Sequence, residues 1–395
     1  MKTATAISRI PGPSLRDYPR GVWDAIFGGR EPVRDSRVHL DSVMQWLCRA
    51  QDATPDRGIA RMYHVRDGWG ASYPETTGYA IPTFFAYADL TGDDEFSRRA
   101  LEMAEWESAI QLSNGAVQGG IVSSTNAPTP AIFNTGQVLF GWCAAHERKP
   151  DTRFGESARR AAQYLTDVQE DDGAWRRNLS DYCDSPDDSY AFNVRTAWAL
   201  MIAGNAFAEQ RFRDGAVANV EFVIRLAHDN GWIEKNCLNR PEQPLLHTIA
   251  YSYQGLLELA ELAGHQGARA LVLRGNTALL ESFERFGRLH GRYEHSWQPT
   301  VTWRCLTGEA QTAIVWFRLA QITGSSAWSD AARRLVAQLK RTHALEGHPG
   351  VRGGIKGSHP ITGAYGRLEY LNWAAKFFAD ALMLDMGVTA ASRRG

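Results

Sequence analysis

The chain has 395 residues, of which 44% are hydrophobic and 22% charged, and its formal net charge is −1. This balance is ordinary for a globular protein and excludes a strong overall field toward nucleic acid or a membrane surface. No apolar stretch approaches the roughly 18 residues of a transmembrane helix, and the five cysteines have no metal-binding spacing. We therefore expect a cytoplasmic protein without a signal peptide, a bound metal or another cofactor.

One kind of helix ending repeats along the chain. In the clearest copy a helix ends at Gln169, the chain turns at Gly173, and Trp175 packs back over the helix end. Similar endings contain Gly58, Gly115, Gly173, Gly231, Gly291 and Gly350. The intervals between these glycines are 57, 58, 58, 60 and 59 residues. A steady period of this length corresponds to two helices with their loops and indicates a repeat architecture.

In chain order, residues 1–36 contain several prolines and predict an extended arm, and two alternating series of helices follow. Amphipathic, Arg- and Glu-rich segments predict outer helices over 38–50, 95–110, 154–168, 212–227, 268–286 and 328–342. Segments that are apolar nearly all round predict buried inner helices over 79–89, 132–146, 192–207, 245–262, 310–322 and 371–384. The first helix is an outer one and the last an inner one, so we expect them to pair and close the ring. The sequence thus predicts an all-α fold, an (α/α)6 toroid over 37–386, with a flexible tail over 387–395.

Each glycine turn leads through a long loop into an inner helix, so the six long loops should lie at one end of the ring, where we expect the functional site. The first loop carries Arg61 and Trp69, and Glu75 opens the first inner helix. Glu75 either complements the helix dipole or points into the cavity as a catalytic acid. Asn134 opens the second inner helix, either as an N-cap or as a substrate contact.

The third loop carries four Asp residues within eight positions, among them Asp184. They form a solvated turn, a cation site or a source of catalytic acid. Asn193 and Arg195 open the helix that follows. In the fourth inner helix His247 and Tyr251 are four residues apart and share a face, either as part of the core or as catalytic groups.

The fifth loop contains Trp303 and Arg304, and Glu309 follows close behind. Glu75 and Glu309 each lie beside a Thr-Gly pair, so we expect them to be counterparts in the first and fifth repeats.

The sixth loop contains His359 and Tyr365, and Asn372 begins the last inner helix. Lys376 lies within this otherwise apolar helix, so it needs a buried partner or binds substrate. Together, the loops concentrate Trp and Arg. Aromatic rings stack on sugars, and Arg pairs with carboxylate, so this mixture suggests an anionic oligo- or polysaccharide as the substrate.

The period and the alternation of inner and outer helices resemble those of (α/α)6-toroid carbohydrate-active enzymes, which include glycoside hydrolases, polysaccharide lyases and glucuronyl C5-epimerases. This resemblance covers residues 38–386. The run from Ser72 to Tyr79 is also similar to proteins of bacterial polysaccharide gene clusters. The element from Gln169 to Trp175 resembles the QW repeat of squalene-hopene and related terpene cyclases, although the run Asp184–Asp188 departs by one residue from their acidic motif. Lanthionine-type cyclases share the toroid but need a Cys/His zinc site, which is not evident here.

Two mechanisms follow from these residues. In the first, Glu75 and Glu309 hydrolyse a glycosidic bond as a carboxylate pair, with a third-loop Asp such as Asp184 able to replace either.

In the second, His247 and Tyr251 abstract the C5 proton of a uronic acid, as in a lyase or epimerase. Neutralisation of the substrate carboxylate would then fall to groups such as Asn193, Arg195, His359 and Tyr365. A third possibility is a toroid that binds a glycan without catalysis.

Overall fold

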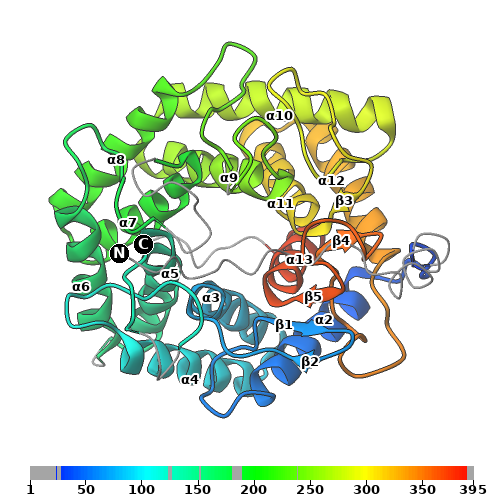
Figure 1. The fold of residues 1–395 in the computed structure, drawn as a ribbon, viewed down its shortest axis with the longest axis horizontal. Coiled ribbons are helices and arrows are strands. Elements are labelled where there is room, and N and C mark those ends of the chain that lie inside the picture. Colours follow the sequence, from blue (N-terminus) through cyan, green and yellow to red (C-terminus); the bar gives the residue numbers. More distant parts are fainter. Residues whose placement is uncertain are drawn as a thin grey trace, which may run out of the picture.

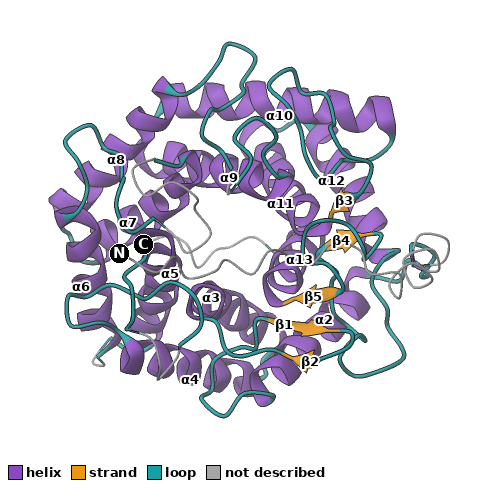
Figure 2. Ribbon diagram, in the orientation of Figure 1, coloured by secondary structure: helices purple, strands orange, loops and turns teal. Residues whose placement is uncertain are grey.

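The computed structural model describes residues 24, 28–122, 127–150, 153–179, 189–237 and 239–388. Within these ranges the chain forms a ring of helices in two concentric layers (Figure 1, Figure 2). The outer helices are α2 (Ser36–Asp52), α4 (Asp94–Ile110), α6 (Phe154–Asp167), α8 (Gln210–Arg225), α10 (Gln266–Phe286) and α12 (Ser326–Lys340). The inner helices are α3 (Pro74–Thr91), α5 (Ile132–Arg148), α7 (Val194–Ala206), α9 (Leu246–Ala263), α11 (Leu306–Thr323) and α13 (Asn372–Asp385). The predicted (α/α)6 toroid is confirmed.

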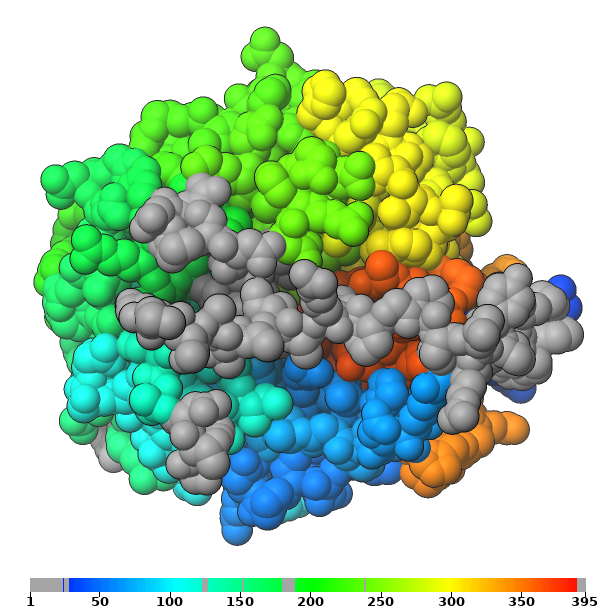
Figure 3. Space-filling view, in the orientation of Figure 1, coloured from blue at the N-terminus to red at the C-terminus, as the bar shows by residue number. Residues whose placement is uncertain are grey.

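The ring closes as predicted, because α2 packs against α13. The last inner helix also contacts its neighbours α11 and α3. In the space-filling view the N-terminal blue region therefore adjoins the C-terminal red region (Figure 3). Most of the predicted arm and nearly all of the predicted tail lie outside the described residues.

Burial separates the two layers. In α6 the buried residues Phe154, Ala158, Ala161 and Leu165 recur every three or four positions, so only one face of the helix meets the core. By contrast, α9 is buried at every position from Leu246 to Ala260, as expected for an inner helix. Among the described residues, no helix is both long and apolar enough to span a membrane.

A repeated glutamine bridge explains the period of the sequence. The Gln169 side-chain amide donates to the carbonyl of Gly173 in its own turn and to that of Gly215 in the next outer helix, each at 2.9 Å. Gln111 and Gln51 each make the same two kinds of bond one and two repeats earlier. The element that resembles a QW repeat is thus a structural link between neighbouring outer helices.

Short strands at the loop-bearing end were not predicted. β1 (Met62–His64) pairs antiparallel with β2 (Gly68–Trp69) and with β5 (Glu369–Leu371), while β3 (Arg304–Cys305) pairs with β4 (Ser358–His359). The order β2-β1-β5 joins the first long loop to the last. A short 3-10 helix, η1 (Ala191–Asn193), precedes α7. The opposite connections are short, as between α3 and α4, so the long loops gather at one end.

Candidate functional site

The first turns of the inner helices meet at the loop-bearing end, and Glu75 is the second residue of α3. Its side chain is half-buried, and its negative charge acts on the buried hydroxyls of Tyr79 and Tyr251 and on that of Tyr365. Burial raises the pKa of Tyr251, and the charge of Glu75 raises it further. A carboxylate and three protonated phenols therefore form one cluster, which we call the Glu75 cluster.

His247 extends this cluster. Its ring centroid lies 4.3 Å from that of Tyr251 and 5.4 Å from that of Tyr365, so the predicted shared face of His247 and Tyr251 is confirmed. Its Nδ1 lies 2.6 Å from the amide oxygen of the buried Gln311. Burial lowers the pKa of His247 to about 3, so the ring is neutral at ordinary pH. With the proton on Nδ1 facing Gln311, Nε2 is left as an acceptor.

Tyr365 reaches the cluster from the sixth loop, and its hydroxyl accepts a hydrogen bond from Trp373 Nε1 at 2.8 Å. Lys376 is buried one turn further along α13, where its ammonium lies 2.6 Å from the carboxylate of Asp380. Thr83 donates to the same carboxylate at 2.8 Å. The partner that Lys376 requires is therefore Asp380, and this pair accounts for its presence without a substrate.

Arg195 lies deeper in the ring than the sequence suggests, and only 2% of it is exposed. It donates to the amide oxygens of Gln137 and Gln254, each at 2.7 Å. Its guanidinium carbon is 5.1 Å from the ring centroid of Tyr251 and 5.2 Å from that of Phe377. Arg195 thus places positive charge below the Glu75 cluster but lies too deep to serve as a surface contact for a large substrate.

Among the buried asparagines, Asn193 has the largest number of polar atoms that no described residue satisfies. Asn193 is 1% exposed, and neither its Oδ1 nor its Nδ2 has a hydrogen-bond partner among the described residues. Asn134 donates to the carbonyl of Gln118 at 3.1 Å, but its Oδ1 has no such partner. Buried polar groups are nearly always satisfied, so these atoms fit a bound polar ligand or water. Asn372 resembles Asn134: its amide nitrogen donates to Thr76 Oγ1 at 2.8 Å, and its Oδ1 has no partner among the described residues.

Glu309 does not occupy the place expected from its Thr-Gly neighbour. It is the fourth residue of α11, whereas Glu75 is the second residue of α3. Two residues turn a helix by about 200°, so the two side chains leave their helices in different directions. Glu309 is fully buried and pairs bidentately with Arg304, at 2.7 and 2.5 Å. The expected counterpart relation is wrong, and Glu309 is bound to Arg304.

Glu369 was missed by the sequence analysis. It begins β5 opposite His64, and its carboxylate lies 3.6 Å from the guanidinium of Arg61. Burial raises the pKa of Glu369, while the charges of Arg61 and His64 oppose that rise. No sequence motif marks this acid, because Arg61 and Glu369 meet only when the ring closes.

The remaining expected residues lie along the rim of the loops. Trp69 packs its ring against Trp46 and Tyr63, with centroids 5.1 and 5.2 Å away. Trp303 covers Gly291, where a Cβ would approach its ring to 2.1 Å. His359 lies 3.6 Å from the carboxylate of Asp24. These three are partly exposed and hold loops together.

Ion pairing changes the electrostatic picture of the site. Arg61, Arg304 and Lys376, which suggested an anionic sugar, each face a carboxylate. Asp184 and the rest of its acidic loop lie outside the described residues. Within the described ranges, no group of three or more His, Cys, Asp or Glu side chains could hold a metal ion.

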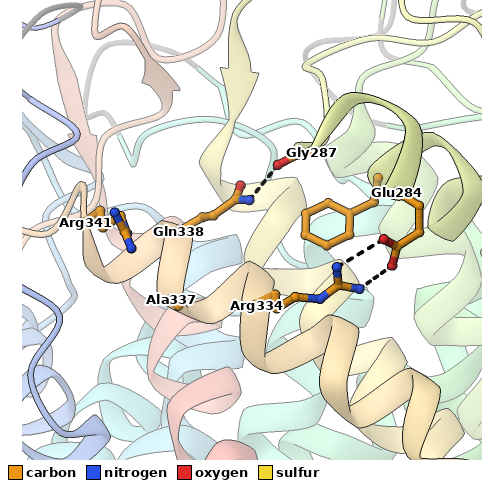
Figure 4. Close-up of a pocket in the computed structure, with 7 residues that line it drawn as sticks. Glu284, Gly287, Arg334, Ala337, Gln338 and Arg341 are labelled. Carbon is orange, nitrogen blue, oxygen red and sulfur yellow. Dashed lines mark hydrogen bonds and ion pairs between the residues drawn. The ribbon is translucent and has the colours of Figure 1, made fainter.

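A groove on the outer layer is lined by polar groups that are already paired with one another. It lies between α10 and α12, where Glu284 pairs with Arg334 and Gln338 donates to the carbonyl of Gly287 at 2.7 Å (Figure 4). These polar groups satisfy one another. The Glu75 cluster, on the inner helices, is therefore the stronger candidate site.

Comparison with known proteins rests on structure, since no protein-family model and no curated protein matches the sequence. An unsaturated glucuronyl hydrolase from a Bacillus species, described as responsible for glycosaminoglycan degradation, matches with a TM-score of 0.69 and 16% identity over 90% of this chain and 98% of its own. A sugar epimerase from a ruminal bacterium matches at 0.72 with 11% identity, covering 90% and 98%. A cellobiose 2-epimerase from Bacillus thermoamylovorans matches at 0.70 with 9% identity, covering 88% and 97%. The chain thus shares the (α/α)6-toroid fold of these carbohydrate-active enzymes over nearly its whole length.

Proposed function

We propose that this protein is a saccharide-processing enzyme in which Glu75 transfers a proton to or from the sugar. The observation that carries this proposal is the Glu75 cluster: a half-buried carboxylate at the first turn of an inner helix, whose charge acts on the protonated hydroxyls of Tyr251 and Tyr365. Of the described inner helices, only α3 and α11 have an acid in the first turn, and Glu75 of α3 is half-buried whereas Glu309 of α11 is fully buried. The hydrolase and epimerases of the same fold are consistent with such chemistry.

The arrangement favours proton abstraction from a sugar carbon, the class that includes epimerases, isomerases and lyases. A carboxylate base needs neutral hydrogen-bond donors near the oxygen on which negative charge develops. The phenols of Tyr251 and Tyr365 stay protonated because burial raises their pKa values. His247 would accept a hydrogen bond from a sugar hydroxyl through Nε2. We therefore assign Glu75 as the base and Tyr251 as the candidate donor, because the charge of Glu75 has the largest charge effect on the pKa of Tyr251.

Hydrogen bonding and stacking, more than charge, would then select the substrate. The ion pairs of Arg61, Arg304 and Lys376 neutralise side chains that could otherwise attract an anionic sugar. Asn193 supplies an unsatisfied amide, which can both donate to and accept from sugar hydroxyls. Neutral and uronic-acid-containing saccharides should both be assayed.

Glycoside hydrolysis is the second candidate, and Glu369 is the observation that favours it. Hydrolysis needs one carboxyl group that stays protonated as the acid and a second that is ionised. Burial raises the pKa of Glu369, as this role requires. Glu369 lies three residues before Asn372, which is hydrogen-bonded to Thr76, next to Glu75. The pair to consider for hydrolysis is therefore Glu75 and Glu369.

One assay separates these reactions. The protein is incubated in deuterated water with neutral disaccharides and with unsaturated and saturated uronate oligosaccharides. With the saturated substrates, deuterium entering a sugar carbon marks proton abstraction, a new unsaturated product marks elimination, and new reducing ends without either mark hydrolysis. With the unsaturated substrates, loss of the double bond together with new reducing ends marks hydrolysis, because hydration of the double bond also places deuterium on carbon.

Glu75→Gln then tests the role of the carboxylate on whichever substrate is turned over. We expect kcat to fall by about 10²- to 10⁴-fold, the usual contribution of a general base. The matched control is Glu242→Gln, an exposed acid in a loop at the same end of the ring. Full activity of Glu75→Gln would refute the assignment. Saccharide binding by calorimetry without turnover would indicate a non-catalytic glycan-binding protein.

A further inference from the structure

Asp24 is buried against the sixth loop, although the two are far apart in the sequence. It lies twelve residues before α2, yet only 6% of it is exposed. Its Oδ1 is 2.6 Å from the ammonium of Lys356, and its Oδ2 accepts the backbone N–H of Ile361 at 2.6 Å. His359 Nδ1 approaches the same oxygen to 3.6 Å. We call these four residues the Asp24 cluster.

The centre of the Asp24 cluster is a buried ion pair between Asp24 and Lys356. Lys356 is 2% exposed, and its ammonium also lies 3.3 Å from the carbonyl oxygen of Gly28. Burial would raise the pKa of Asp24, but the nearby His359 ring and the charge of Lys356 bring it down to about 2. Asp24 is therefore ionised, and its negative charge opposes the lowering of the Lys356 pKa by burial. Removing one partner of a buried ion pair leaves the other charge uncompensated, so the geometry of this contact is strongly held.

The same loop carries Tyr365 into the Glu75 cluster. Ser358 Oγ donates to the carbonyl of Tyr365 at 2.6 Å and accepts its N–H at 3.1 Å. The N–H of Leu368 donates to the carbonyl of Ile361 at 2.9 Å, which closes the loop around its tip. The ring of Tyr365 then contacts His247. Asp24 thus binds the loop at Lys356, before Ser358, and at Ile361, between Ser358 and Tyr365.

We propose that Asp24 is a positioning residue that holds the sixth loop in the conformation that places Tyr365 beside His247. The contact joins Asp24 to a loop that follows 332 positions later and reaches the candidate site. Its structural part is independent of the reaction. Its effect on turnover rests on the proposed function.

Hydrogen exchange of the full-length protein tests the structural part. In Asp24→Asn we expect the segment 356–366 to exchange at least about tenfold faster, because Ile361 loses a charged acceptor and Lys356 loses its counter-ion. Asp35→Asn is the matched control: Asp35 is exposed, lies in the same N-terminal region and makes no side-chain cap bond. Exchange equal to that of Asp35→Asn would overturn the proposal. If Asp24→Asn does not fold, the double variant D24N/K356Q removes both charges and is measured in its place.

Kinetics test the positioning role, once the assay above has found a substrate. At a temperature well below the unfolding transition, Asp24→Asn should lower kcat by about tenfold. The change in KM should be smaller than the change in kcat. Faster exchange with unchanged kcat would overturn the positioning role. Faster exchange of a protein inactive on every saccharide would support the structural contact and count against the proposed function, so the two failures are distinct.

Discussion

Glu309 was predicted to be a catalytic carboxylate, but the structure shows it in an ion pair with Arg304. Its two oxygens bind Arg304 in a buried, bidentate pair. Glu309→Gln keeps the shape but weakens the pairing, and breaking a buried ion pair costs about 3–5 kcal/mol. We expect that order of loss in the free energy of unfolding, measured by chemical denaturation, with kcat within about threefold of wild type.

Glu242→Gln again serves as the exposed control, with a stability change below about 0.5 kcal/mol. A normal stability combined with a large loss of kcat in Glu309→Gln would return this residue to the catalytic machinery.

Gln311 fixes the proton of His247 through the 2.6 Å contact at Nδ1. Gln311→Glu places a carboxylate at that contact, and a neighbouring negative charge stabilises the imidazolium. The pKa of His247 should therefore rise from about 3 into the range accessible to titration. Nitrogen NMR of the histidine rings measures this, with His247→Gln used to assign the signal.

Gln338→Glu is the matched control, since Gln338 lies on the outer helix α12 and bonds to Gly287. A His247 ring that remains neutral down to pH 4 in Gln311→Glu would contradict the assigned contact.

The spacing of residues predicted some of the site well. His247 and Tyr251 lie within one helix, where a separation of four fixes their relation. The comparison of Glu75 with Glu309 failed because a Thr-Gly pair does not fix the helical register, and two residues reverse the direction of a side chain. Arg61 immediately precedes β1 and Glu369 begins β5, and these two strands lie far apart in the sequence, so local patterns carry no information about their contact.

At the scale of elements, the period near 60 residues predicted the helices because each glycine turn is fixed by its neighbours. Gly173 has φ +85°, and a Cβ there would lie 2.1 Å from the carbonyl oxygen of Ala218 in the next outer helix. Helix ends were predicted less well. For example, α11 begins at Leu306, four residues before the predicted start at 310. The strands have only two or three residues, too few for an alternating pattern.

Gly173→Ala should destabilise the protein more than its backbone conformation alone requires. A positive φ costs a non-glycine residue about 1 kcal/mol, and the collision with Ala218 adds to this cost. Gly92→Ala is the matched control, since Gly92 has φ +70° and nothing within 4 Å of a Cβ. We expect Gly173→Ala to lose at least about 2 kcal/mol more than Gly92→Ala in chemical denaturation. Equal losses would show that the glycine turn has room to move.

At the scale of the whole molecule, ring closure was predictable because the helix series begins with an outer helix and ends with an inner one. Its details were not. Where α2 meets α13, at the seam that closes the ring, Nδ1 of His39 lies 2.8 Å from Nδ1 of His343. Both histidine rings contact Phe378 of α13. The two histidines come from residues 304 positions apart, and only the closed ring brings them together.

The seam should make stability depend on pH. Burial lowers the pKa of His39 to about 3 and that of His343 to about 4, so both stay neutral in the folded protein while the unfolded chain binds protons below pH 6.5. Their contribution is complete above pH 6.5 and is lost as the pH falls toward 4. Each histidine contributes a slope of about 1.4 kcal/mol per pH unit in that window.

His343→Gln removes one of these two titrating groups and therefore isolates its share of the slope. Between pH 6 and 5, where His343 stays neutral in the folded state, the slope of the unfolding free energy should fall by about 1.4 kcal/mol per pH unit relative to wild type. His295→Gln, at an exposed position in the loop before α11, is the matched control and should leave the slope within error. Because other titrating groups act alike in all three proteins, the difference in slope reports His343 alone. An unchanged slope in His343→Gln would mean that the His39–His343 contact already opens to water in the folded ring.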